Sequence, residues 1–123
     1  MPSPTKPAHS AAVLAAYDRV IATQPGVTRN GVTIPYTSLN GNMSSDLDET
    51  GRLVLRLSAD DRAAFIAGYR TGLHEAHGTV QKEYVDAPAA LLEATDELAP
   101  FFARSVAYVG GLRPKPTTRK RAT

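Results

Sequence analysis

Cysteine is absent from the sequence, and its absence excludes several kinds of site. Without a thiol the chain forms no disulfide, no thiolate zinc site and no cysteine nucleophile, and it suits a reducing compartment. Long apolar runs are also lacking. None approaches the ~18 consecutive residues of a membrane-spanning helix, and the N-terminus carries no signal-peptide pattern. We therefore expect a soluble, cytoplasmic protein with no membrane partner.

Catalytic, phosphate-binding and metal-binding motifs are missing as well. The sequence contains no G-x-x-x-x-G-K-[ST] loop, no G-x-G-x-x-G loop and no nucleophile elbow. His74 and His77 are three residues apart, but no third ligand is near them in sequence, and the metalloprotease spacing is H-E-x-x-H. A calcium loop starting at Asp46 would place Leu57 where a glutamate is required. We predict surface or loop histidines, no metal, no cofactor and no catalytic residue.

Basic residues gather at the C-terminal end. Of fourteen Lys and Arg, five lie in residues 113–123, which hold no acid, so nine bases face twelve acids in residues 1–112. The five are Arg113, Lys115, Arg119, Lys120 and Arg121. One hypothesis is that they bind nucleic acid non-specifically through its phosphates. The alternative, a solubilising extension, is favoured because the segment has no aromatic residue that could stack on a base.

The length and composition favour one folded unit. A chain of 123 residues that is 42% apolar and 21% charged is typical of a single globular domain. We expect a disordered leader over residues 1–9, one domain over residues 10–112 and a disordered basic tail over residues 113–123.

Helical patterns occur near both ends of this domain and in its middle. Ser10 is a good N-cap for a helix over residues 11–24, and Ser58 for a second helix that Gly72 would end. Pro88 fits the first turn of a further helix. Pro100 lacks an amide proton, so it should kink or split that helix into two parts.

Between the first two helices the apolar residues recur every second position, which indicates β-strands. Val32, Ile34 and Tyr36 begin this pattern, and Asn40-Gly41 is a strong hairpin signal. With a second turn at residues 48–51, the pattern predicts three antiparallel strands, and Pro35 should lie at an edge or bulge. One more strand is expected within residues 78–88. The fold class is therefore α+β: an antiparallel β-meander packed against helices, with the N-terminal helix first and a two-part C-terminal helix.

Three segments resemble a known family. "PYTSLNGNM" (residues 35–43), "HGTVQKEYV" (residues 77–85) and "LRPKPTTRKR" (residues 112–121) are similar to the TfoX N-terminal domain-like group of small bacterial proteins, near the YjbR-type domains. The resemblance implies a compact α+β domain with a regulatory or protein-binding role. It also implies an outline similar to secretion-chaperone folds. Ser44, Ser45 and Asp46 replace bulky apolar residues of that pattern, so the second strand should be half solvated or shortened.

Together these features predict a non-enzymatic regulatory or protein-binding module, with a homodimer as one option. The exposed edge of the meander is the expected contact surface because unpaired strand edges can accept another strand. Its residues are Tyr36, Thr37, Ser38 and Asn40. Two alternatives stay open: nucleic-acid binding by the basic tail, and a small-molecule or enzyme pocket. That pocket would need His77, Lys82 and Glu83 to converge with Tyr36.

Overall fold

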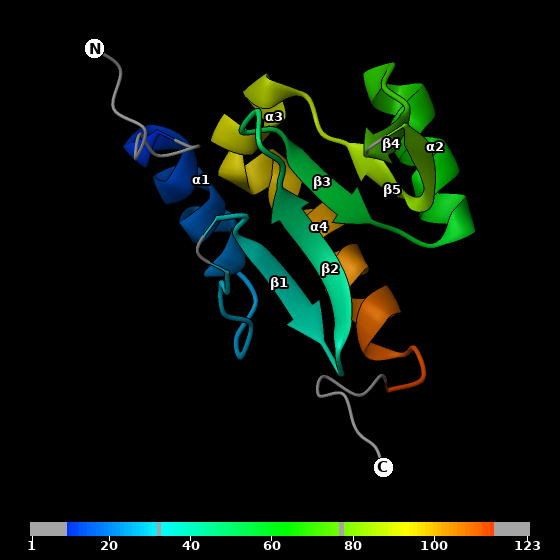
Figure 1. Ribbon diagram of the computed structural model, residues 1–123, viewed down its shortest axis with the longest axis horizontal. Helices are drawn as coiled ribbons and strands as arrows, with labels where there is room; N and C mark the ends of the chain where they lie inside the picture. Colours follow the sequence, from blue (N-terminus) through cyan, green and yellow to red (C-terminus); the bar gives the residue numbers. More distant parts are fainter. Residues whose placement is uncertain (1–9, 32, 77, 115–123) are drawn as a thin grey trace.

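The computed structural model describes residues 10–31, 33–76 and 78–114, which form an α+β fold (Figure 1). The elements follow in the order α1 (Ala11–Ile21), β1 (Tyr36–Leu39), β2 (Asn42–Leu47), β3 (Leu53–Arg56), α2 (Ala59–Tyr69), β4 (Leu73–Ala76), β5 (Thr79–Asp86), α3 (Ala89–Glu93) and α4 (Thr95–Gly110). Helices α1, α3 and α4 contact one another, and α4 passes behind the strands in Figure 1. The predicted fold class is confirmed.

The strands form one antiparallel sheet in the order β1-β2-β3-β5-β4. The meander of β1, β2 and β3 is confirmed, but the expectation of a single strand after α2 is wrong. A hairpin of β4 and β5 stands there, turning through Gly78 at φ +78°. The sequence does not reveal β4, because its four residues show no alternation of apolar and polar side chains. As an edge strand, β4 also leaves its leucine, Leu73, 38% exposed.

Cross-strand partners divide the sheet into two faces, because residues directly opposite each other share a face. One row joins Thr37, Ser45, Leu55 and Val85, all buried beneath the helices. The neighbouring row joins Tyr36, Asp46, Val54 and Asp86 on the other face, hereafter the open face. The charged residues of these two rows, Asp46 and Asp86, thus lie on the face away from the helices.

The core lies between the helix-facing side of the sheet and the helices. Tyr17 of α1, Phe65 of α2 and Phe102 of α4 are its largest members, each fully buried. Phe65 also packs edge-on against Phe101, with ring centroids 5.0 Å apart, which joins α2 to α4.

A β-bulge interrupts the pairing of β1 with β2. Thr37 lies opposite Ser45 whereas Ser38 lies opposite Met43, so Ser44 is an extra residue on β2. Such a bulge turns two consecutive side chains toward the same face. Ser44 and Ser45 are both fully buried, and Met43 and Asp46 come to the open face on either side of them.

Hydrogen bonds explain how these serines are tolerated in the interior. Thr37 Oγ1 lies 2.6 Å from the hydroxyls of both Ser44 and Ser45, and the Tyr17 hydroxyl lies 2.6 Å from Ser45 Oγ. Ser105 Oγ of α4 donates to the Ser44 carbonyl at 3.0 Å. β2 still spans six residues, so the expected shortening is wrong, and Ser44 and Ser45 are fully buried because their hydroxyls are paired; Asn42, Met43 and Asp46 are only half-buried.

Local turn and cap signals were mostly reliable. Asn40 and Gly41 have φ of +54° and +80°, as a tight hairpin turn requires. Ser10 caps α1 and Ser58 caps α2, as predicted. However, α2 ends at Tyr69, with Arg70 in the left-handed region at φ +52°, rather than at Gly72.

The C-terminal helix has two parts, as predicted, but the break falls elsewhere. It lies at Ala94, whose φ of −98° and ψ of 73° leave the helical region. Pro100 lies inside α4. It removes only one intrahelical hydrogen bond near the start of a helix that Leu98 and Phe102 anchor in the core.

We expect Thr37→Val to lower the free energy of unfolding by about 1–3 kcal/mol, because it leaves buried serine hydroxyls without their partner. The matched control is Thr79→Val on exposed β5 surface, which should change stability by less than about 0.5 kcal/mol. Urea denaturation measures both variants. Equal effects of the two substitutions would contradict a stabilising role for the hydroxyl network.

Candidate binding site

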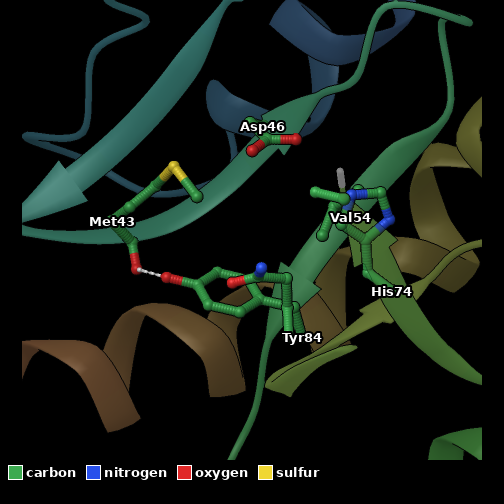
Figure 2. Close-up of a pocket in the computed structure, with 7 residues that line it drawn as sticks. Met43, Asp46, Val54, His74 and Tyr84 are labelled. Atoms are coloured by element: carbon green, nitrogen blue, oxygen red, sulfur yellow. Dashed lines mark hydrogen bonds between the residues drawn. The ribbon is translucent and has the colours of Figure 1, made fainter. Parts of the chain in front are cut away.

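A cavity of ≈ 210 Å³ lies on the open face, between β2 and β3 on one side and the β4–β5 hairpin on the other (Figure 2). We call it the Asp46 cavity; its lining is Met43, Asp46, Val54, His74, Ala76, Gln81 and Tyr84. Val54 is fully buried although it lies on the open face, and Figure 2 shows it beside His74. The cavity therefore combines apolar walls with a few polar groups, as ligand sites usually do.

Two broader hollows adjoin this cavity and share Asp48, Thr50, His74 and Glu75. Their volumes are ≈ 570 Å³ and ≈ 390 Å³. We call them together the acidic groove. Its charged lining comprises Asp46, Asp48, Glu49, Arg52, His74, Glu75 and Asp86. Carboxylates clearly outnumber cations along it, so the groove favours a positively charged occupant.

Asp46 is the most distinctive group in the cavity. Its Oδ1 atom is buried and has no hydrogen-bond partner among the described residues. Burial raises the pKa of Asp46 to about 6, with the carboxylates of Asp48 and Asp86 adding to the rise and His74 opposing it. A buried polar atom without a partner costs stability, and such atoms with perturbed pKa values are concentrated at functional sites.

His74 lies opposite Asp46 in the cavity, on β4 (Figure 2). Its Nδ1 is 2.7 Å from Asp86 Oδ1, and its side chain is only 13% exposed. The expectation of an ordinary surface or loop histidine is therefore wrong for His74, because strand pairing brings it against Asp86. His77 lies outside the described residues.

Asp48 stands at the turn between β2 and β3. Burial acts to raise the pKa of Asp48, but hydrogen bonds from Thr50 and Arg52 outweigh it, so the pKa is lowered. Its Oδ1 accepts from the Thr50 and Arg52 amides at 2.9 and 3.0 Å. Asp48 thus carries a negative charge at neutral pH.

A group of hydrogen-bonded side chains lies next to Tyr84, outside the lining of the cavity. The Arg56 guanidinium lies 5.5 Å from the centre of the Tyr84 ring, and Arg56 Nε donates to Glu83 Oε1 at 2.8 Å. The Tyr108 hydroxyl donates to Glu83 Oε2 at 3.1 Å. The hydrogen bond from Arg56 lowers the pKa of Glu83. Tyr84 donates to the Met43 carbonyl at 3.4 Å, which joins two residues of the cavity lining (Figure 2).

Of the residues predicted for a polar pocket, the three that the structure describes, Tyr36, Lys82 and Glu83, are not brought together. Glu83 is held by Arg56 and Tyr108, Lys82 is exposed, and neither lines the Asp46 cavity. Tyr36 is half-buried on β1, at the far edge of the sheet from β4. A cavity exists on the described part of the chain, but other residues form it.

The predicted contact surface on β1 is more occupied than expected. Thr37 is fully buried, so it cannot meet a partner, which corrects that expectation. The backbone of Asn30 makes two hydrogen bonds to that of Tyr36, at 2.8 and 2.9 Å, and covers the start of this edge. Asn40 is exposed, yet its side chain donates to the Gly110 carbonyl at 3.1 Å. Ser38 is half-buried.

The basic tail is described only at its beginning. Arg113 is exposed, and its carbonyl accepts a hydrogen bond from the Asn42 side chain at 3.0 Å. The other predicted phosphate-binding residues, Lys115, Arg119, Lys120 and Arg121, lie outside the described residues. Nucleic-acid binding by the tail stays a prediction.

The ionisable side chains in the lining of the Asp46 cavity are those of Asp46, His74 and Tyr84, and Asp86, the partner of His74, lies outside that lining. Within the described ranges, no three or more histidine and acidic side chains are grouped so as to hold a metal ion. In the same ranges every helix is too short or too polar to cross a bilayer.

Comparisons with known proteins found no matching family model, no matching curated protein and no matching solved structure. The resemblance to the TfoX N-terminal domain-like family therefore stays a prediction.

Sequence reasoning did not identify Asp46 as a site residue, although a signal was present. Ser44, Ser45 and Asp46 stand where a strand of this kind was expected to be apolar. A run of polar residues inside a strand pattern can indicate either a weakened strand or a site. The bulge decides between these two possibilities, because it turns Ser44 and Ser45 into the core and Asp46 to the open face.

We expect Asp46→Asn to raise the free energy of unfolding at pH 7.5 by about 1–2 kcal/mol, less than the full pKa shift implies because the carboxyl is partly exposed. The folded-state pKa of Asp46 is raised, so its ionised form destabilises the fold above about pH 6. The advantage of the variant should shrink as the pH falls and vanish below about pH 4, where Asp46 is protonated in both states. Denaturation at several pH values measures it.

The control is Glu49→Gln, which removes one exposed charge from the same surface. Its effect on stability should be small and should not follow the same pH dependence. An Asp46→Asn variant that is less stable than the wild type at pH 7.5 would show that the carboxylate contributes favourably to the fold.

Proposed function

We propose that the chain is a non-enzymatic, cytoplasmic module that binds a basic segment of a partner protein in the acidic groove. The observation that carries this proposal is the charge of the groove. Its lining holds five carboxylates, from Asp46, Asp48, Glu49, Glu75 and Asp86, against the single guanidinium of Arg52 and the imidazole of His74. Asp86 is shared by these two, through contacts of 3.4 Å to Arg52 and 2.7 Å to His74. With Asp86 shared in this way, the lining still holds more acidic than basic groups, an excess of negative charge that a basic partner would neutralise.

Apolar residues beside the groove favour a protein as the partner. Among the described residues, the large apolar side chains that are exposed are Ile34, Leu73 and Val80, at 36%, 38% and 42%. Ile34 and Leu73 line the groove itself. A surface that combines exposed apolar side chains with charge suits a peptide segment, whose own side chains offer both kinds of contact.

The position of the groove supports the same proposal. It lies on the sheet face that no described helix covers, and it reaches the edge strand β4. A segment bound there would be able to follow the groove without any helix moving away. The acidic charge also argues against nucleic acid on this face, because phosphates would be repelled.

The test uses a short synthetic peptide of lysine and valine residues, with a glutamate–valine peptide of equal length for comparison. Fluorescence anisotropy should show that the intact chain binds the lysine peptide, that binding weakens as salt is added, and that the glutamate peptide does not bind. The double variant Glu49→Lys/Glu75→Lys should weaken binding about tenfold, since each reversal removes a favourable and adds an unfavourable interaction.

The matched control is Glu93→Lys, which reverses an exposed charge on α3, outside the groove lining. It should leave the affinity for the lysine peptide unchanged. Equal binding of the two peptides, or equal loss in both variants, would contradict the proposal. Tighter binding to duplex DNA than to the lysine peptide would favour the basic-tail hypothesis instead.

A further inference from the structure

We propose that the Asp46 cavity is a subsite for one lysine side chain of the bound segment, whose ammonium group pairs with the Asp46 carboxylate. This inference rests on the proposed function, because it assigns one position of the partner within the acidic groove. It specifies that the residue of the partner at that position is a lysine, which the charge of the groove alone does not determine.

The size of the cavity favours one side chain over a whole ligand. Its volume of ≈ 210 Å³ is below the roughly 300–1,000 Å³ of sites that enclose drug-sized molecules. It shares Asp46, His74 and Ala76 with one hollow of the acidic groove, so the two spaces adjoin at these residues. A segment lying in the groove would therefore be placed to insert a side chain at this point.

The walls suit the aliphatic part of a lysine. Met43 and Ala76 supply accessible apolar surface, the Tyr84 ring forms a further wall, and the fully buried Val54 lies beneath them. Figure 2 shows Met43, Val54 and Tyr84 around the same space as Asp46. Lysine commonly buries its methylene stem against apolar surface while its ammonium meets a polar group.

The polar side of the cavity suits the ammonium group. Asp46 lines it with a carboxylate whose Oδ1 is buried and has no partner among the described residues, so an ammonium that meets the accessible part of this carboxylate would compensate its charge at close range. An ammonium has three donors. The His74 imidazole, whose Nδ1 is engaged by Asp86, and the Gln81 side-chain amide line the same cavity and are further polar groups beside Asp46.

Arginine fits this arrangement less well. A guanidinium prefers a carboxylate with two accessible oxygens in a planar fork. The neighbouring carboxylate of Asp86 is already engaged by His74 and Arg52. Because Oδ1 is buried, Asp46 does not offer a guanidinium two accessible oxygens, whereas a compact point charge needs only one.

The experiment is a double-mutant cycle between the protein and a peptide whose lysines are unequally spaced, so that it binds in a single register. Each lysine is replaced in turn by norleucine, and the affinities for the wild type and for Asp46→Asn are measured by fluorescence anisotropy. We expect one position at which the replacement costs at least tenfold in affinity for the wild type and almost nothing for Asp46→Asn. Arginine at that position should restore only part of the loss.

The matched control is Glu75→Gln, which removes a carboxylate from the groove but not from the Asp46 cavity. It should weaken all of the peptides by a similar small factor and leave the special position intact. Asp46→Asn is nearly isosteric, and its fold is checked by denaturation and circular dichroism before binding is measured.

A pH titration gives an independent readout. Affinity for the wild type should fall as the pH drops through about 6, because Asp46 becomes protonated. The titratable groups facing Asp46 are His74, Asp48, Asp86 and Tyr84, and all of them are retained in Asp46→Asn. The difference in the pH dependence of peptide affinity between the wild type and Asp46→Asn therefore reports the titration of Asp46.

Several outcomes would overturn the subsite while leaving the proposed function standing. The clearest is peptide binding in which every lysine contributes equally and none is coupled to Asp46. An affinity that rises tenfold on removal of residues 115–123 would show that the chain's own tail, rather than a partner lysine, occupies the cavity. Absence of any lysine-peptide binding would overturn the proposed function itself.

Discussion

The bulge at Ser44 is the constraint on which both faces of the sheet depend. Because β2 holds one residue more than β1 at this point, Ser44 and Ser45 both turn inward, and Met43 and Asp46 reach the open face. A regular strand would alternate strictly and would place Met43 and Ser45 together on the helix-facing side. The same irregularity thus produces a polar cluster in the core and a charged cavity outside it.

The polar cluster in the core and the charged cavity outside it differ in what their burial costs the fold. Inside, the hydroxyls of Thr37, Ser44, Ser45 and Tyr17 are mutually hydrogen-bonded, so their burial costs little. Outside, the Asp46 carboxylate is left with a buried oxygen that no described residue satisfies. Natural proteins tolerate such local costs mainly where a site requires them, and the rest of the domain supplies the stability.

Local chemistry accounts for the parts of the fold that the sequence predicts well. The caps at Ser10 and Ser58, the turn at Asn40-Gly41 and the meander all depend on residues close together in the chain. The failures involve distant partners. β4 is held by its pairing with β5 despite lacking a strand pattern, and α4 continues through Pro100 because Leu98 and Phe102 are fixed in the core. The candidate site is the extreme case, since it unites residues from four strands that no single segment reveals.

The contact between the β1–β2 turn and the end of α4 has a mechanical consequence. Asn40 and Asn42 hold the carbonyls of Gly110 and Arg113 at 3.1 and 3.0 Å, across some seventy positions of sequence. A force applied to the chain beyond Pro114 therefore reaches the hairpin directly, as well as passing along α4. The two asparagines thus join the β1–β2 turn to the last described residues of the chain. Tension from anything attached there would be shared between helix and sheet, in a region separate from the acidic groove.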